Sequence, residues 1–123
     1  MRDDVIERLK SLGYTVTAED GFGLMFVIDK VTNIIKNDCN ISEIPDGLYH
    51  IAVDMVCGEF LLVKKQGGQL ADFNAESAIK QISQGDTSIT YAVSEGTAGI
   101  DGLISLLMNK DRSQFATYRR FKW

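Results

Sequence analysis

Apolar residues recur at helical spacing in several stretches of the chain. The first stretch places them at i, i+3 and i+4 positions with charged residues between: Val5, Ile6, Leu9 and Leu12. Gly13 follows directly, and glycine is the preferred residue for a left-handed helix C-cap. We therefore predict a short helix from Asp3 or Asp4 to about Leu12.

A second helical stretch follows this glycine. Thr17, with Asp20 three residues later, approximates a capping box, so we expect the helix to begin near Ala18. Two readings stay open for Gly21 and Gly23: each weakens the first turn by ~1 kcal/mol relative to Ala, or they instead permit close backbone packing there. The apolar stripe of this helix comprises Leu24, Val27, Ile28, Val31, Ile34 and Ile35.

The third stretch predicts a longer helix. Pro45 suits its first turn, where the missing N–H costs nothing, and the pattern continues to about Lys65. A helix of roughly 20 residues is ~30 Å long. Apolar residues wrap most of its circumference, which indicates a central helix contacted on several sides. His50, Asp54 and Glu59 are the polar exceptions.

The pattern changes after this helix. "GGQ" at residues 67–69 breaks it, and residues 75–83 suit either a short helix or a strand. "GDTSITYAV" then alternates with a period of two, and "QGD" before it is a turn signal. These features predict a short β-ribbon near residues 79–93. Apolar positions predict a last helix from Ile100 to Met108.

These elements together predict a mainly α protein, a small helical bundle around a long central helix. We expect one helical domain at residues 1–110, with residues 84–94 projecting from it, and an extended C-terminal tail at 111–123. No stretch approaches the ~20 apolar residues of a membrane span, and the start of the chain lacks the pattern of a signal peptide. We therefore expect a cytosolic protein without a membrane partner.

Charge is unevenly distributed along the chain. Residues 1–109 contain eight Lys or Arg and sixteen Asp or Glu, a charge of −8, whereas the remainder contains five and one, a charge of +4. An acidic body with a basic tail suits an acidic partner, including another copy of the chain. It is a poor match to a dedicated nucleic-acid binder, whose recognition face tends to be basic.

No catalytic or cofactor motif is present in the sequence. A metal site would have to draw on Cys39, His50, Cys57, Asp54 and Glu59, but the two cysteines lack the paired short spacing of zinc ligands. We expect both cysteines to be buried thiols, and no cofactor or metal. Asp54 and Glu59 are expected in structural salt bridges or at an interface, because charges on a mostly buried helix are usually paired. The sequence therefore favours a binding or assembly role over an enzyme.

The chain ends in "FATYRRFKW", which contains its only Trp. Aromatic and Arg side chains often dominate protein–protein interfaces, so a protein-docking peptide is our first interpretation. Two other interpretations stay open. In one, the tail packs against its own core through its aromatic residues; in the other, it stacks on nucleic-acid bases and neutralises phosphates.

Four segments give the sequence a family resemblance: "ERLKSLGY", "NISEIPDGLYHIAVDMVCGEFL", "QGDTSITYAV" and the terminal "YRRFKW". In this order they resemble the small head–tail connector (adaptor, or head-completion) proteins of tailed bacteriophages and prophages. The resemblance covers nearly the full chain. Its most specific parts are the helix from Pro45 to Leu62, the turn at residues 85–87 with its strand, and the aromatic-basic end.

The resemblance implies a structural virion protein with no enzyme activity and no cofactor. Such a subunit assembles in the host cytoplasm and forms a ring, expected to be dodecameric, beneath the portal at the head–tail junction. The ring extends the channel, through which DNA passes without specific binding, and docks a downstream head-completion or tail protein. The alternative is a small nucleic-acid-binding regulatory protein that uses the basic tail.

The resemblance also assigns candidate contact residues. Those expected to dock on the portal or another partner are Phe115, Tyr118, Arg119, Arg120, Phe121 and Trp123. Those expected between neighbouring subunits are Gly85, Asp86, Thr87, Ile89, Tyr91, Asp54 and Glu59.

Overall fold

The computed structural model of the chain describes residues 1–70, 73–74, 78, 100–109 and 114–115, and these residues are mainly helical. The elements are α1 (Arg2–Ser11), the 3₁₀ helix η1 (Ala18–Asp20), α2 (Gly21–Cys39), α3 (Asp46–Gln66) and α6 (Ile100–Asn109). The mainly α fold is thus confirmed. The ribbon expected near residues 79–93 and the tail beyond residue 115 lie outside the described residues.

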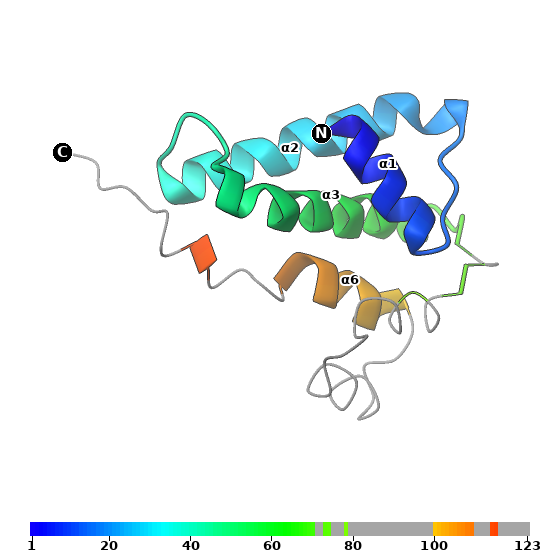
Figure 1. The fold of residues 1–123 in the computed structure, drawn as a ribbon. Coiled ribbons are helices and arrows are strands. Elements are labelled where there is room, and N and C mark those ends of the chain that lie inside the picture. Colours follow the sequence, from blue (N-terminus) through cyan, green and yellow to red (C-terminus); the bar gives the residue numbers. More distant parts are fainter. Residues whose placement is uncertain (71–72, 75–77, 79–99, 110–113, 116–123) are drawn as a thin grey trace.

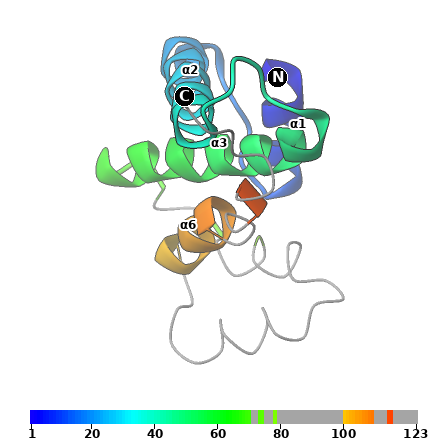
Figure 2. The ribbon, with the colours of Figure 1, turned by 90° about the vertical axis from the view of Figure 1, so that its left-hand side faces the viewer.

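The long helix α3 lies at the centre of the bundle, as the sequence predicts. It packs against α1, α2 and α6. Figures 1 and 2 both show α2 on one side of α3 and α6 on the opposite side. The apolar circumference of α3 is explained by this arrangement, because each of its faces meets a different helix. The largest fully buried side chains of the core are Phe60, Phe115, Leu9, Leu24, Ile35, Leu48, Leu61 and Leu103.

The helix ends follow local sequence signals. Gly13 has φ +99°, and the Tyr14 N–H reaches back to the Leu9 carbonyl at 2.9 Å, which completes the expected C-cap of α1. Gly68 (φ +71°), the second glycine of "GG", ends α3 in the same way, and the Gln69 N–H reaches back to the Lys64 carbonyl at 3.0 Å. α2 runs to Cys39 and stops on Asn40 in the left-handed region at φ 54°. Asn tolerates this conformation better than most residues.

Close backbone packing occurs at Gly58 and not at Gly21 or Gly23, for which the sequence left it open. A Cβ atom on Gly23 would meet nothing within 4 Å, and one on Gly21 would meet only an Arg2 side-chain nitrogen at 3.9 Å, so neither position needs a glycine for close packing. A Cβ atom on Gly58 would instead lie 2.6 Å from Met108 Cγ and 3.0 Å from Leu107 Cβ. The absence of a side chain at Gly58 therefore lets α3 and α6 approach closely.

In the described part of the chain, no helix combines the length and the apolar character needed to cross a membrane.

Candidate functional site

The outer face of α2 exposes large apolar side chains. Phe22 is 85% exposed, Phe26 60% and Met25 41%. They occupy i, i+3 and i+4 positions, so they are neighbours on one side of the helix. We call these three residues the α2 apolar face. Contiguous exposed aromatic surface of this kind usually marks a binding site.

This face is separate from the stripe that joins α2 to the bundle. Leu24, Val27, Val31 and Ile35 are buried against the core, and Phe22 and Phe26 lie on the opposite side of the helix. The apolar stripe predicted from the sequence is buried except for Ile34, which is 39% exposed, and the apolar residues on the outer side of α2 were missed. The signal that could have revealed them was "FGLMF", in which apolar residues occupy positions outside the core-facing set.

Two exposed acids flank the α2 apolar face. Glu19 lies in η1, one turn before Phe22, and Asp29 lies one turn after Met25 and Phe26. Within the described part of the chain, neither carboxylate takes part in an ion pair. Lys30 is also exposed, but it pairs with Glu59 of α3 at 2.7 Å. The surface therefore offers aromatic area bordered by unneutralised negative charge.

A polar network fixes the start of α2, and with it the position of Phe22. Asp20 is only 4% exposed, and its carboxylate accepts hydrogen bonds from the Tyr14 hydroxyl and the Thr17 N–H, both at 3.0 Å. Lys64 of α3 forms an ion pair with the same carboxylate. The capping box expected at Thr17 and Asp20 is present. Its buried carboxylate also joins the α1–η1 connection to the end of α3.

The charge states within this network are fixed at neutral pH. Burial alone would raise the pKa of Asp20, but hydrogen bonds from Lys64, the Thr17 amide and Tyr14 outweigh burial and hold it below its usual value. The hydrogen bond to Asp20 raises the pKa of Lys64. Burial, followed by the hydrogen bond to Asp20, raises the pKa of the Tyr14 phenol. Asp20 is thus anionic, Lys64 cationic and Tyr14 neutral, which suits a structural tie and not proton transfer.

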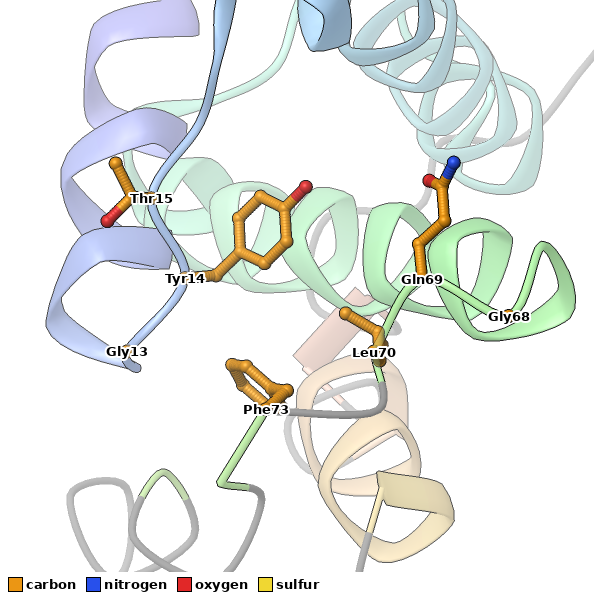
Figure 3. A pocket seen from close by; sticks show the side chains of 7 residues that line it. All are labelled: Gly13, Tyr14, Thr15, Gly68, Gln69, Leu70 and Phe73. Atoms are coloured by element: carbon orange, nitrogen blue, oxygen red, sulfur yellow. The ribbon is translucent and has the colours of Figure 1, made fainter.

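A pocket of about 420 Å³ opens between the α1–η1 connection and the end of α3 (Figure 3). The Tyr14 ring forms one wall; it meets Phe60 edge-on, with ring centroids 5.6 Å apart, and Phe73 at 6.5 Å. Among the described residues, no charged side chain lines the pocket, and the Tyr14 hydroxyl donates a hydrogen bond to Asp20. The lining residues are Gly13, Tyr14, Thr15, Gly68, Gln69, Leu70 and Phe73.

A second pocket, of about 460 Å³, lies between α1 and α3, and most of the residues that line it carry ionisable side chains. Arg8 donates a hydrogen bond from Nε to Asp54 Oδ1 at 2.8 Å across it. His50 is exposed and its ring meets the Tyr49 ring edge-on, with centroids 5.6 Å apart. The lining residues are Asp4, Glu7, Arg8, His50, Val53 and Asp54.

The two acids of α3 that were assigned to subunit contacts are engaged within the subunit. Asp54 pairs with Arg8 of α1, and Glu59 pairs with Lys30 of α2. These pairs confirm the expectation of structural salt bridges. Both are partly exposed to solvent, so each contributes about 1 kcal/mol or less. A role for Asp54 and Glu59 between subunits remains a prediction.

The cysteines expected to be buried thiols are confirmed as such, and they lie in different parts of the core. The Cys39 thiol lies 3.8 Å from the Phe115 carbonyl oxygen, and the Cys57 thiol lies 3.8 Å from that of Val5. Burial raises the pKa of the Cys57 thiol. Among the described residues, no three His, Cys, Asp or Glu side chains gather as a metal site would require.

Of the tail residues expected to dock on a partner, only Phe115 lies within the described residues. It is fully buried, and its carbonyl lies beside Cys39 at the end of α2. In this fold Phe115 is therefore a core side chain and not an exposed anchor, which corrects its assignment and matches the self-packing alternative for this one position. The remaining assigned residues lie outside the described part of the chain: Gly85, Asp86, Thr87, Ile89, Tyr91, Tyr118, Arg119, Arg120, Phe121 and Trp123.

Comparison of the chain with known proteins finds no matching family model, no matching curated protein and no matching solved structure.

Proposed function

We propose that the chain is a structural assembly protein, a head–tail connector subunit that forms a ring beneath a phage portal. The observation that carries this proposal is the α2 apolar face, on which Phe22 is 85% and Phe26 60% exposed. Exposing aromatic side chains to water is unfavourable, so such a surface is typically covered in an assembly. The resemblance of the sequence to connector proteins supplies the type of assembly.

The roles of the charged side chains support an assembly protein. Asp20, Asp54 and Glu59 each join two parts of the bundle through a Lys or an Arg. These contacts produce a body held together across α1, α2 and α3. A ring subunit needs such a body, because each copy must present its surfaces in a fixed orientation to its neighbours.

The charge distribution supports a channel through which DNA passes. Residues 1–109 have a charge of −8, and like charge opposes phosphate binding. The basic residues of the tail, Arg119 and Arg120, pair with acids on the portal or on a neighbouring subunit. No catalytic step is part of the proposed function.

The test is binding to a phage portal protein, the partner that the proposed function requires. Purified full-length chain is mixed with portal rings, and bound copies are counted by native mass spectrometry and electron microscopy. We expect a ring of added density on the portal. A chain that never binds portal rings would contradict the proposal.

The structure also determines where the tail should be cut in this test. Because Phe115 is a core residue, the truncation should remove residues 116–123 and retain Phe115. Two matched variants separate the roles of the side chains: Tyr118→Ser with Phe121→Ser removes aromatic anchors, and Arg119→Gln with Arg120→Gln removes charge. Unchanged virion assembly in all three variants would reject the tail as a docking element.

The charge of +4 from Lys110 onward favours one second candidate, a nucleic-acid-binding regulator. It predicts DNA binding that weakens steeply with salt, with a slope set by the number of phosphates neutralised. The absence of a gel shift at low ionic strength would exclude it.

A further inference from the structure

We infer that the α2 apolar face is the docking site for the C-terminal segment, residues 116–123, of a second copy of this chain. The inference goes beyond the portal-docking role, because it names an occupant for a surface that the sequence pattern did not reveal. It also assigns the tail a partner that is independent of any portal.

The tail and the proposed docking site belong to opposite ends of one helix. The described chain ends at Phe115, whose carbonyl lies 3.8 Å from the thiol of Cys39, the last residue of α2. Phe22 lies in the first turn of the same helix. Figure 1 shows the short segment at residues 114–115 near the end of α2 that leads into α3, away from its start.

This geometry disfavours docking of a tail on its own subunit. Cys39 lies thirteen positions after Phe26, which corresponds to about 20 Å along the helix axis, and the tail must also pass from the core to the outer face. Tyr118 reaches only about 10 Å from Phe115 in a fully extended chain, and Trp123 about 27 Å. At most the last residues of a straight tail arrive at Phe26, whereas the tail of a neighbouring copy has no such restriction.

The chemistry of the two surfaces is complementary. The segment "ATYRRFKW" alternates aromatic residues with Arg119, Arg120 and Lys122. The α2 apolar face offers exposed aromatic area, and Glu19 and Asp29 lie on either side of it without an ion pair within the described part of the chain. Aromatic side chains would cover Phe22 and Phe26, while the cations approach the flanking carboxylates. Tyr, Trp and Arg are the residues that most often dominate such interfaces.

A contact between a tail at one end and a surface at the other is heterologous. Each copy donates its tail to one neighbour and accepts the tail of another, so the association repeats head to tail. Whether it closes into a ring depends on the rotation between neighbours. Either outcome follows from the same contact.

The test is complementation between two defective chains. One chain carries Phe22→Ser and Phe26→Ser and retains its tail; the other ends at Phe115 and retains the α2 apolar face. We expect the full-length chain to self-associate with concentration in analytical ultracentrifugation, and each defective chain alone to stay monomeric. Mixed together, the two should form a one-to-one heterodimer that does not grow.

The chain's single tryptophan gives a second, direct measurement. The chain that ends at Phe115 contains no Trp, so the fluorescence of a synthetic peptide of residues 116–123 reports its binding alone. Phe22→Ser with Phe26→Ser in the receiving chain should weaken binding by about tenfold or more. Asp29→Asn should weaken peptide binding by a smaller factor, and this factor should be larger at low salt, where charges are less screened. Glu43→Gln, in the connection between α2 and α3, is the matched charge control and should leave binding unchanged.

Three outcomes would overturn the inference. The first is a full-length chain that stays monomeric at every concentration and a peptide that does not bind. The second is self-association of the chain that ends at Phe115, which would show that copies meet through another surface. The third is a peptide that binds equally well to the wild-type α2 apolar face and to the face that carries Phe22→Ser and Phe26→Ser. Portal binding is measured separately, so failure of either proposal leaves the other testable.

Discussion

The ammonium group of Lys64 forms an ion pair with the carboxylate of Asp20, whose side chain is only 3% exposed. Lys64 lies in the last turn of α3, and Asp20 lies at the junction of η1 and α2. Tyr14 and Thr17 contribute further hydrogen bonds to the same carboxylate. One buried charge therefore holds three segments together, two residues before Phe22, the first exposed aromatic residue of the α2 apolar face.

Asp20→Asn should destabilise the protein by roughly 2–3 kcal/mol, because it removes the charge and leaves the partly buried Lys64 without its counter-charge. The free energy of unfolding, measured in urea by circular dichroism, checks this value. Glu19→Gln is the matched control, because Glu19 is exposed and forms no ion pair within the described residues; it should change stability by about 0.5 kcal/mol or less. Equal effects from both substitutions would contradict the structural role of Asp20.

The same pair predicts how stability depends on pH. The folded-state pKa of Asp20 is lowered, so its contribution is present above the unfolded-state pKa of about 3.9 and is lost as the pH falls through the folded-state value. The folded-state pKa values of Lys64 and Tyr14 are raised, so their contributions are lost as the pH rises above about 10. The stability difference between wild type and Asp20→Asn should be flat between about pH 5 and 9 and shrink below about pH 4. A stability difference between wild type and Asp20→Asn that grows as the pH falls would contradict the lowered pKa of Asp20.

Gly58→Ala should destabilise the packing of α3 against α6. The added methyl group would lie 2.6 Å from Met108 Cγ, which belongs to a flexible side chain, but also 3.0 Å from Leu107 Cβ, which cannot move without α6. Alanine gains up to about 1 kcal/mol over glycine within a helix, and overpacking costs about 1–3 kcal/mol. We expect a net loss of about 1–2 kcal/mol in urea unfolding.

Gly23→Ala is the matched control for this substitution. Gly23 is also helical, but a Cβ atom there would meet nothing within 4 Å. The same chemical change should therefore stabilise the protein, by about 0.5–1 kcal/mol. If the two substitutions change the free energy of unfolding in opposite directions, the close approach of α3 and α6 is supported. Changes in the same direction would contradict it.

The sequence predicted the helices well because their signals are local. The spacing of Leu24, Val31 and other apolar residues, the glycine at position 13 and the capping box at Thr17 are each contained within a few residues. Close packing of helices depends instead on residues distant in sequence. Nothing near Gly58 indicates that Leu107 and Met108 lie beside it, so the sequence raised close packing only for Gly21 and Gly23 and not for Gly58.

The candidate surface was less predictable for a related reason. A helix with apolar residues on two sides does not reveal which side is buried, because burial depends on where the neighbouring helix lies. Phe22 and Phe26 are exposed because α3 packs against the apolar stripe on the opposite side of α2. Similarly, the pairing of Asp54 with Arg8 joins residues 46 positions apart. Sequence reasoning identified Asp54 as a charge that needs a partner but not the partner itself.

The cysteines should be unreactive in the folded protein. Cys39 and Cys57 are fully buried, and burial raises the pKa of the Cys57 thiol, which disfavours the reactive thiolate. We expect a thiol reagent such as Ellman's reagent to modify neither residue under native conditions and both in concentrated urea. The rate in intermediate urea should follow the unfolded fraction. Rapid modification of one thiol in the native state would contradict the burial described.

Phe115→Ala and Phe26→Ala test the division between core and surface. Phe115 is fully buried, so its truncation should reduce the free energy of unfolding by about 3–4 kcal/mol, as for other buried aromatic residues. Phe26 is 60% exposed, and its truncation should change that free energy by about 0.5 kcal/mol or less. Urea unfolding at low protein concentration, where copies are separate, gives both values.

The pair also tests what the α2 apolar face contacts. If Phe26→Ala destabilises the separate chain as strongly as Phe115→Ala, then Phe26 is covered within its own subunit and is not available to a neighbour. If only Phe115→Ala destabilises the separate chain, Phe26 is a surface residue that becomes buried only when copies associate. In that case Phe26→Ala should reduce self-association of the full-length chain while leaving its unfolding unchanged, because the lost apolar contact exists only between copies.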